Sequence, residues 1–200
     1  MGKSKSGEGN KWLKDRGEFE EEILTMADDA GILYENSLDL LKSMKNFAGN
    51  VGEGEKKHPY GKAANAARAY GSGMKNSAAS FNHSGEQFDK LFEACNTFKD
   101  QINGNVLAKL ISFKDVECKD VDTQMTQLKK AQKDYANKKS KIVPDQVQVD
   151  AAEATLKKLL EEAKATLEKF NKTGCELLTQ ISADMKTGFD AYCDAAASIN

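Results

Sequence analysis

Residues 88–141 read FDKLFEACNTFKDQINGNVLAKLISFKDVECKDVDTQMTQLKKAQKDYANKKSK, and this segment sets the architecture that we expect. Apolar side chains recur along it at steps of three and four residues, and no proline interrupts them. This spacing is typical of an amphipathic α-helix, so we predict one long helix here. The apolar positions are Phe88, Leu91, Cys95, Phe98, Ile102, Val106, Leu110, Phe113, Val121, Met125, Leu128 and Tyr135.

The C-terminal end of this segment carries a dense group of lysines. Six lysines and a single acid, Asp134, stand between residues 129 and 141, which leaves a local excess of five positive charges. The whole chain holds 29 basic and 31 acidic residues, so its net charge favours no class of partner. The local excess instead predicts a polarised surface. The lysines are Lys129, Lys130, Lys133, Lys138, Lys139 and Lys141.

Two further apolar seams flank the central segment. The first runs from Phe19 to Phe47 and the last from Leu156 to Ile199, both with the four-three spacing of helices that pack in coiled coils. Glycines predict a loop at residues 49–58, and Pro144 predicts the end of the middle helix. The last helix has two candidate N-terminal caps, Asp145 with Gln148 or Asp150 with Glu153.

The middle helix is expected to extend from Tyr60 to Lys141, which is 82 residues and about 120 Å. Its first part, as far as Glu86, is rich in alanine and glycine, and each glycine costs a helix about 1 kcal/mol relative to alanine. We therefore expect this part to bend or fray unless it is packed. Gly104 is the expected position of a second bend.

Three helices of alternating direction predict an all-α fold, an elongated antiparallel three-helix coiled coil that occupies residues 11–200 as one domain. The three helices hold roughly 38, 82 and 55 residues by this interpretation, so they cannot cover one another completely. Exposed apolar surface beyond a few hundred square ångströms usually indicates a partner. A twofold homodimer is the expected solution, because the same surface then serves both subunits.

The sequence offers no arrangement for catalysis. The two histidines, His58 and His83, form no metal-binding or nucleophile–histidine pattern, and the four cysteines show no CxxC spacing. We expect no catalytic residue, no metal, no cofactor and no disulfide. No apolar run approaches the roughly 20 residues that span a bilayer, and no signal peptide precedes the first helix, so a cytoplasmic protein is expected.

Residues 1–10 contain no large apolar side chain after Met1 and are expected to form a flexible arm. Gly2 and Ser6 match the N-myristoylation pattern, and Lys3 and Lys5 would strengthen such an anchor. The same residues also suit a plain disordered tail, because the pattern is short.

A family resemblance rests on residues of the second and third helices. VLAKLISF at 106–113, followed by LKK at 128–130 and the lysines at 138–141, resembles the second-helix signature of BAR (Bin/amphiphysin/Rvs) domains. Ala152-Glu153, Leu156, Ala163 and Phe170 fit the third helix of that family. The resemblance covers about residues 19–199 and lacks the amphipathic N-terminal helix of one branch of the family.

The resemblance implies a crescent-shaped homodimer that lies peripherally on membranes, binds anionic phospholipids and senses or generates curvature, as in endocytosis and vesicle trafficking. The lipid-binding residues that we expect are the six lysines above together with Lys157 and Lys158. The alternative is that these lysines are simply exposed to solvent at a helix end and bind no partner. A second functional hypothesis is a dimeric helical scaffold that binds a small GTPase or an actin-regulating partner. Nucleic acid is disfavoured, because the lysine group has no arginine and the whole chain is slightly acidic.

Overall fold

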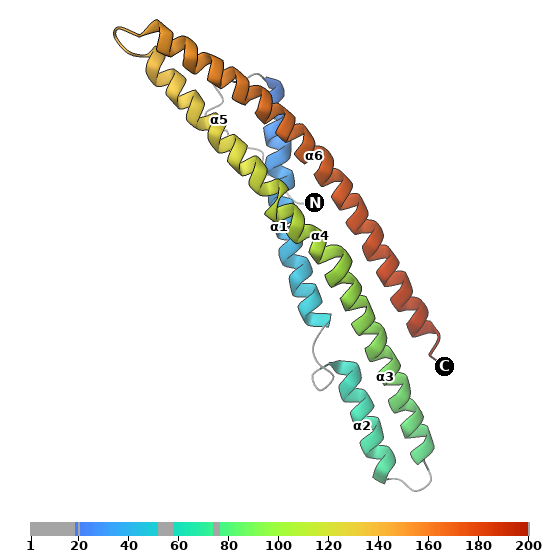
Figure 1. Cartoon of the computed structure of the whole chain (residues 1–200). Coiled ribbons are helices and arrows are strands. Elements are labelled where there is room, and N and C mark those ends of the chain that lie inside the picture. The colour runs from blue at the N-terminus through green and yellow to red at the C-terminus, as the bar shows by residue number, and fades with distance from the viewer. Residues whose placement is uncertain (1–18, 20, 52–57, 74–76, 200) are drawn as a thin grey trace. The chain divides into compact units, whose positions relative to one another are not determined.

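The computed structural model describes residues 19, 21–51, 58–73 and 77–199, and every regular element among them is a helix (Figure 1). The all-α prediction is therefore confirmed for this part of the chain. The predicted arm at residues 1–10, Gly2 and most of the predicted loop at residues 49–58 lie outside the described residues. The elements are α1 (Glu21–Val51), α2 (Pro59–Gly73), α3 (Ala78–Gln101), the π-helical segment η1 (Ile102–Leu107), α4 (Ala108–Asp115), α5 (Glu117–Lys139) and α6 (Gln146–Ala197).

The prediction of one continuous helix from Tyr60 to Lys141 is wrong. The chain reverses between α2 and α3, and these two helices pack against each other as an antiparallel hairpin. Small residues make this close packing possible. A Cβ atom at Gly71 would lie 2.8 Å from Asn82 Oδ1 and 3.3 Å from the carbonyl oxygen of Ala78, so a larger residue would require the Asn82 side chain to move. The alanines and glycines that indicated a weak helix are therefore the contact surface of two helices.

Gly104 lies in η1, where the predicted second bend is replaced by a change of helix type. The backbone N–H of Ala108 donates to the carbonyl oxygen of Asn103, five residues earlier, which is the π-helical hydrogen-bond pattern. A second interruption follows at Val116, which separates α4 from α5. The long apolar stripe therefore continues through a helix with two irregular points.

The described residues fall into two compact units. Unit 1 comprises residues 21–39 and 112–176, and unit 2 comprises residues 40–111 and 177–199. Helices α1, α4 and α6 contribute residues to both units. Helix α2 packs against α3, so part of the α3 surface that was expected to need a second subunit is covered within the chain.

The core of unit 1 is formed mainly by three helical segments of alternating direction, from α1, α5 and α6. Helices α5 and α6 are antiparallel neighbours joined by a short turn (Figure 1), and the Phe113 ring stacks on Phe170 with centroids 5.1 Å apart. The first part of α1 runs parallel to α6. Glu22 pairs with Lys164 at 3.4 Å, and a few residues later the Met26 carbonyl accepts a hydrogen bond from the Asn171 side chain at 3.3 Å. The fully buried members of this core are Ile23, Ala27, Ala30, Phe113, Cys118, Val121, Met125, Leu128, Ala163, Leu167 and Phe170.

Unit 2 centres on the Phe98 ring. This buried side chain contacts Phe47 of α1 edge-on at 6.1 Å and stacks with Tyr192 of α6 at 6.0 Å. Helix α6 runs antiparallel to α3 and α4 here, because Lys109 of α4 pairs with Asp184 at 2.7 Å while Phe98 of α3 meets the later residue Tyr192. The apolar spacing of the sequence therefore identified the buried faces of both helices.

Candidate functional site

The turn between α5 and α6 is held at both ends. Helix α5 ends at Lys139, and the N–H of Ser140 donates to the Ala136 carbonyl at 3.0 Å. On the other side, Asp145 Oδ1 accepts hydrogen bonds from the backbone N–H groups of Val147 and Gln148 at 3.1 and 3.3 Å. The Gln148 side chain in turn donates to Asp145 Oδ2 at 3.0 Å. Of the two predicted caps, the structure forms the one at Asp145.

Replacing the cap residue tests how firmly this turn is held. Asp145→Ala is expected to lower the free energy of unfolding by about 1 kcal/mol, because two N–H groups at the start of α6 lose their acceptor. Thermal unfolding followed by circular dichroism measures the change. Asp150→Ala is the matched control. Its carboxylate accepts only from the exposed Gln146 side chain at 2.8 Å, so a smaller loss is expected. Equal losses in both variants would contradict the capping role.

Three of the predicted lysines share one exposed face of α5. Lys129, Lys130 and Lys133 are exposed, and their spacing confines them to an arc of about 100° on a helix with 3.6 residues per turn. Leu128 is buried on the other side of the helix, and Met125, one turn before Lys129, is buried at the edge of this face. This arrangement gives α5 a cationic stripe that faces solvent, which we call the lysine stripe.

The other predicted lysines near the turn are held differently. Lys138 forms an ion pair with Asp134 at 2.8 Å, and the Lys139 ammonium lies over the Tyr135 ring, 5.2 Å from its centroid. Lys141 is exposed in the turn itself. The six lysines are therefore brought to one end of the α5–α6 hairpin but are not all on one face.

Lys157 and Lys158 lie on α6, and both sit beside acids of the same helix. Lys157 pairs with Glu153 at 2.7 Å, and this hydrogen bond lowers the pKa of the Glu153 carboxyl and raises the pKa of the Lys157 ammonium. Lys158 lies 3.7 Å from Glu162. Their charges are therefore largely balanced within α6, unlike those of the lysine stripe.

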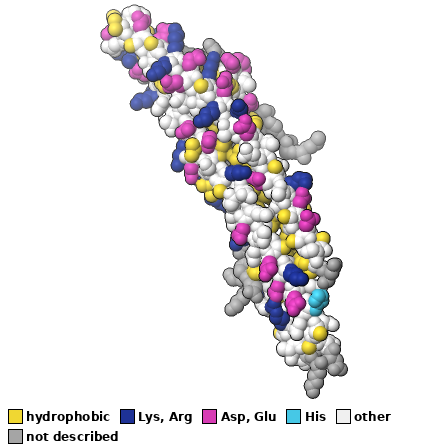
Figure 2. Space-filling view, turned by 45° about the vertical axis from the view of Figure 1, so that its right-hand side comes forward, with side chains coloured by type: hydrophobic (Ala, Val, Ile, Leu, Met, Phe, Trp, Pro, Cys, Tyr) yellow, Lys and Arg dark blue, Asp and Glu magenta, His cyan; other side chains and the backbone are white. Residues whose placement is uncertain are grey.

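Sequence reasoning missed three apolar side chains at the same turn. Ile142, Val143 and Val147 are 102%, 84% and 77% exposed, the highest values among the exposed large hydrophobic residues of the described chain. Figure 2 shows hydrophobic side chains at this end of the hairpin, with acidic side chains beside them and lysine side chains further along the helices. The signal was present, because KIVPDQV places β-branched apolar residues where a turn is normally polar.

Unit 2 contains a group of titratable side chains that pack against each other. The Tyr192 phenol forms hydrogen bonds with Tyr60 and Cys95, and the bond to Tyr60, together with burial, raises the pKa of Tyr192 above its usual range. Burial also raises the pKa of the Cys95 thiol. His58 is buried beside Tyr60 and Phe92. These groups satisfy one another within the core of the unit, so the thiol is kept protonated and away from solvent.

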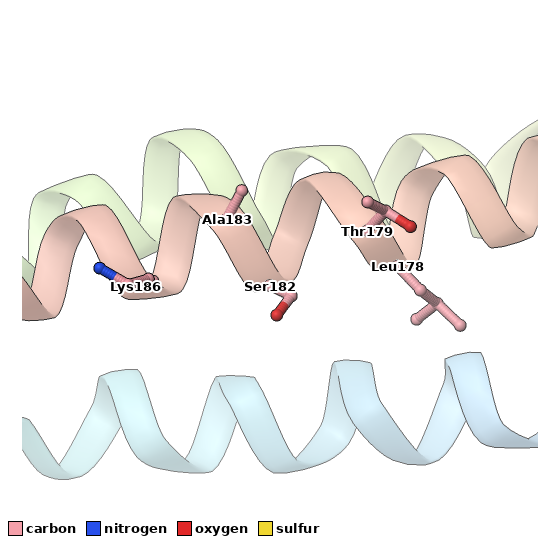
Figure 3. A pocket seen from close by; sticks show the side chains of 5 residues that line it. All are labelled: Leu178, Thr179, Ser182, Ala183 and Lys186. Atoms are coloured by element: carbon pink, nitrogen blue, oxygen red, sulfur yellow. The ribbon is translucent and has the colours of Figure 1, made fainter.

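A shallow hollow on the surface of unit 2 is lined by one helix only. Figure 3 shows its five lining side chains, all of which come from α6, and those of Leu178 and Ala183 point to opposite sides. No set of polar groups converges in it. Among the described residues there is also no group of three or more histidine, cysteine and acidic side chains placed to hold a metal ion.

Comparison of the sequence with protein-family models gave no match, and comparison with curated proteins gave no significant relative. Within the described residues, no helix combines the length and the apolar character needed to cross a membrane.

Proposed function

We propose that this chain is a peripheral membrane-binding protein of the BAR type, which binds anionic phospholipids as a homodimer and senses or generates membrane curvature. The observation that carries the proposal is the lysine stripe of Lys129, Lys130 and Lys133, next to a turn that adds Lys138, Lys139 and Lys141. Each lysine close to an anionic leaflet contributes about 1 kcal/mol to binding. A dimer would present two such ends, so both can engage one surface at once.

The BAR resemblance at residues 106–113 and 128–130 is supported by the helix order of unit 1. There α1 runs parallel to α6, and α5 runs antiparallel to α6, as an up-down-up arrangement of three helices requires. The α2–α3 hairpin is a departure from the three-helix layout that the resemblance implies.

Sedimentation of the protein with vesicles of graded phosphatidylserine content tests the lipid-binding proposal. Bound protein should increase with the content of anionic lipid and decrease as salt is raised, because exposed charges are screened over about 8 Å at physiological ionic strength. Repeating the measurement with vesicles of several diameters tests the preference for curvature.

The dimer gives a separate prediction. Unit 2 exposes apolar side chains that a second subunit would cover, namely Phe47, Ile111 and Leu178. Sedimentation equilibrium at micromolar concentration should therefore give twice the 21.9 kDa chain mass. A stable helical monomer under these conditions would remove the homodimer from the proposal.

The alternative function is a dimeric helical scaffold that binds a small GTPase or a cytoskeletal regulator. The exposed aromatic side chains of Tyr70 and Phe189, at 64% and 54%, favour it, because aromatic residues are common anchors in protein interfaces. If the unmodified protein binds no acidic vesicle, the scaffold becomes the better-supported function.

A further inference from the structure

The α5–α6 turn has an apolar tip in addition to its lysines. Ile142, Val143 and Val147 stand within six residues of one another and are almost entirely exposed. Single exposed apolar residues are ordinary on protein surfaces, whereas a group of three at one turn indicates an interaction site. They do not fill a gap in the core, since the buried side chains at the start of α6 are Val149 and Ala152.

The backbone that carries these side chains is held by hydrogen bonds at both helix ends. The Ser140 and Asp145 hydrogen bonds close the two helix ends, and the N–H of Val149 donates to the Asp145 carbonyl at 3.0 Å. Pro144 restricts the backbone between them. Because the backbone of the turn is already ordered, little conformational entropy is lost when these side chains bind another surface.

The charges around the tip are distributed unequally. Lys138, Lys139 and Lys141 come immediately before it, with Lys138 paired to Asp134 of the same helix, whereas Asp145, Asp150 and Glu153 lie on the α6 side. Of those acids, Asp145 caps the helix and Glu153 pairs with Lys157. The apolar tip is therefore bordered by positive charge on its α5 side.

This combination fits a bilayer better than a protein surface. Protein interfaces are anchored mainly by tryptophan, tyrosine and arginine, which the tip lacks. A bilayer instead offers hydrocarbon below a layer of anionic headgroups, which matches aliphatic side chains bordered by lysines.

We propose that Ile142, Val143 and Val147 form a wedge that inserts between the headgroups of an anionic membrane while the neighbouring lysines bind the phosphates. The inference rests on the proposed lipid-binding function and adds to it an apolar contribution that salt does not screen.

The test compares the wild-type chain with the triple variant Ile142→Ser, Val143→Ser, Val147→Ser, which keeps every charge. Sedimentation with phosphatidylserine vesicles at low and high salt measures affinity, and the maximum insertion pressure into a phosphatidylserine monolayer measures penetration. The variant should bind at least tenfold more weakly, should lose the binding that remains at high salt, and should insert only at lower pressure. Ile32→Ser removes a side chain that is 60% exposed on α1 and is the matched control, for which wild-type binding is expected.

The possible results separate the two proposals. If the wild type binds and the folded triple variant binds and inserts equally well, the wedge is wrong and the lysine-based function stands. A change in the mass of the variant at sedimentation equilibrium, with lipid binding unchanged, would assign the tip to contact between copies of the chain and would also overturn the wedge. If the wild type binds no acidic vesicle, the proposed function itself fails. Circular dichroism of each variant verifies that it is folded.

Discussion

Replacing Lys129, Lys130 and Lys133 by glutamate is expected to abolish sedimentation of the protein with phosphatidylserine vesicles. The loss of three lysines near the surface removes about 3 kcal/mol, and three carboxylates add repulsion, so affinity should fall at least a hundredfold. These side chains are exposed on the face of α5 opposite the buried Leu128. Helix content by circular dichroism and mass by sedimentation should therefore stay unchanged.

A second variant controls for total charge. Lys42, Lys45 and Lys90 are exposed residues of unit 2, and their replacement by glutamate changes the charge of the chain by the same amount. We expect this variant to bind acidic vesicles almost as the wild type does. If both variants lose binding equally, the contact depends on the overall charge of the chain and the lysine stripe has no special role.

Phe170→Ala is expected to lower the free energy of unfolding by about 3–5 kcal/mol, the usual cost of removing a buried aromatic ring. The Phe170 side chain is 2% exposed and stacks on Phe113, so its loss leaves a cavity in the core of unit 1. Such a loss is a large part of the stability of an ordinary domain. Urea unfolding followed by circular dichroism measures it.

Phe189→Ala is the matched control for the aromatic deletion. Its ring is 54% exposed, although it contacts Phe98 with centroids 6.2 Å apart, and a loss of about 1 kcal/mol or less is expected. Equal destabilisation by the two variants would contradict the assignment of Phe170 to the core.

The apolar periodicity of the sequence predicted the helices and most of their buried faces, because that spacing follows directly from helix geometry. It could not separate α2 from α3. The segment around Gly71-Ser-Gly73 has no proline, and its alanines suit a continuous helix as well as a hairpin. The hairpin is decided by contacts between residues far apart in sequence, such as the hydrogen-bonded pair of Arg68 and Asp89. Local spacing does not report such contacts.

The sequence predicted only part of the candidate site, because the rest also depends on contacts and exposure that local spacing does not report. Composition located the lysines at the end of the second apolar stripe, and helix geometry then placed Lys129, Lys130 and Lys133 together. The pairing of Lys157 with Glu153 depends on side-chain conformation, which the sequence leaves open. The apolar tip was missed because residues 140–145 were interpreted only as a helix terminator, and its importance appears once exposure is known.

Hydrogen–deuterium exchange of the full chain, with and without phosphatidylserine vesicles, tests the membrane contact most directly. Amides of the α5–α6 turn are exposed in the free protein, and a bilayer that covers the turn slows their exchange with water. We predict that vesicles slow exchange most in peptides covering residues 139–148. Unchanged exchange in these peptides while the protein is bound, or slowing confined to other helices, would contradict membrane binding through this turn.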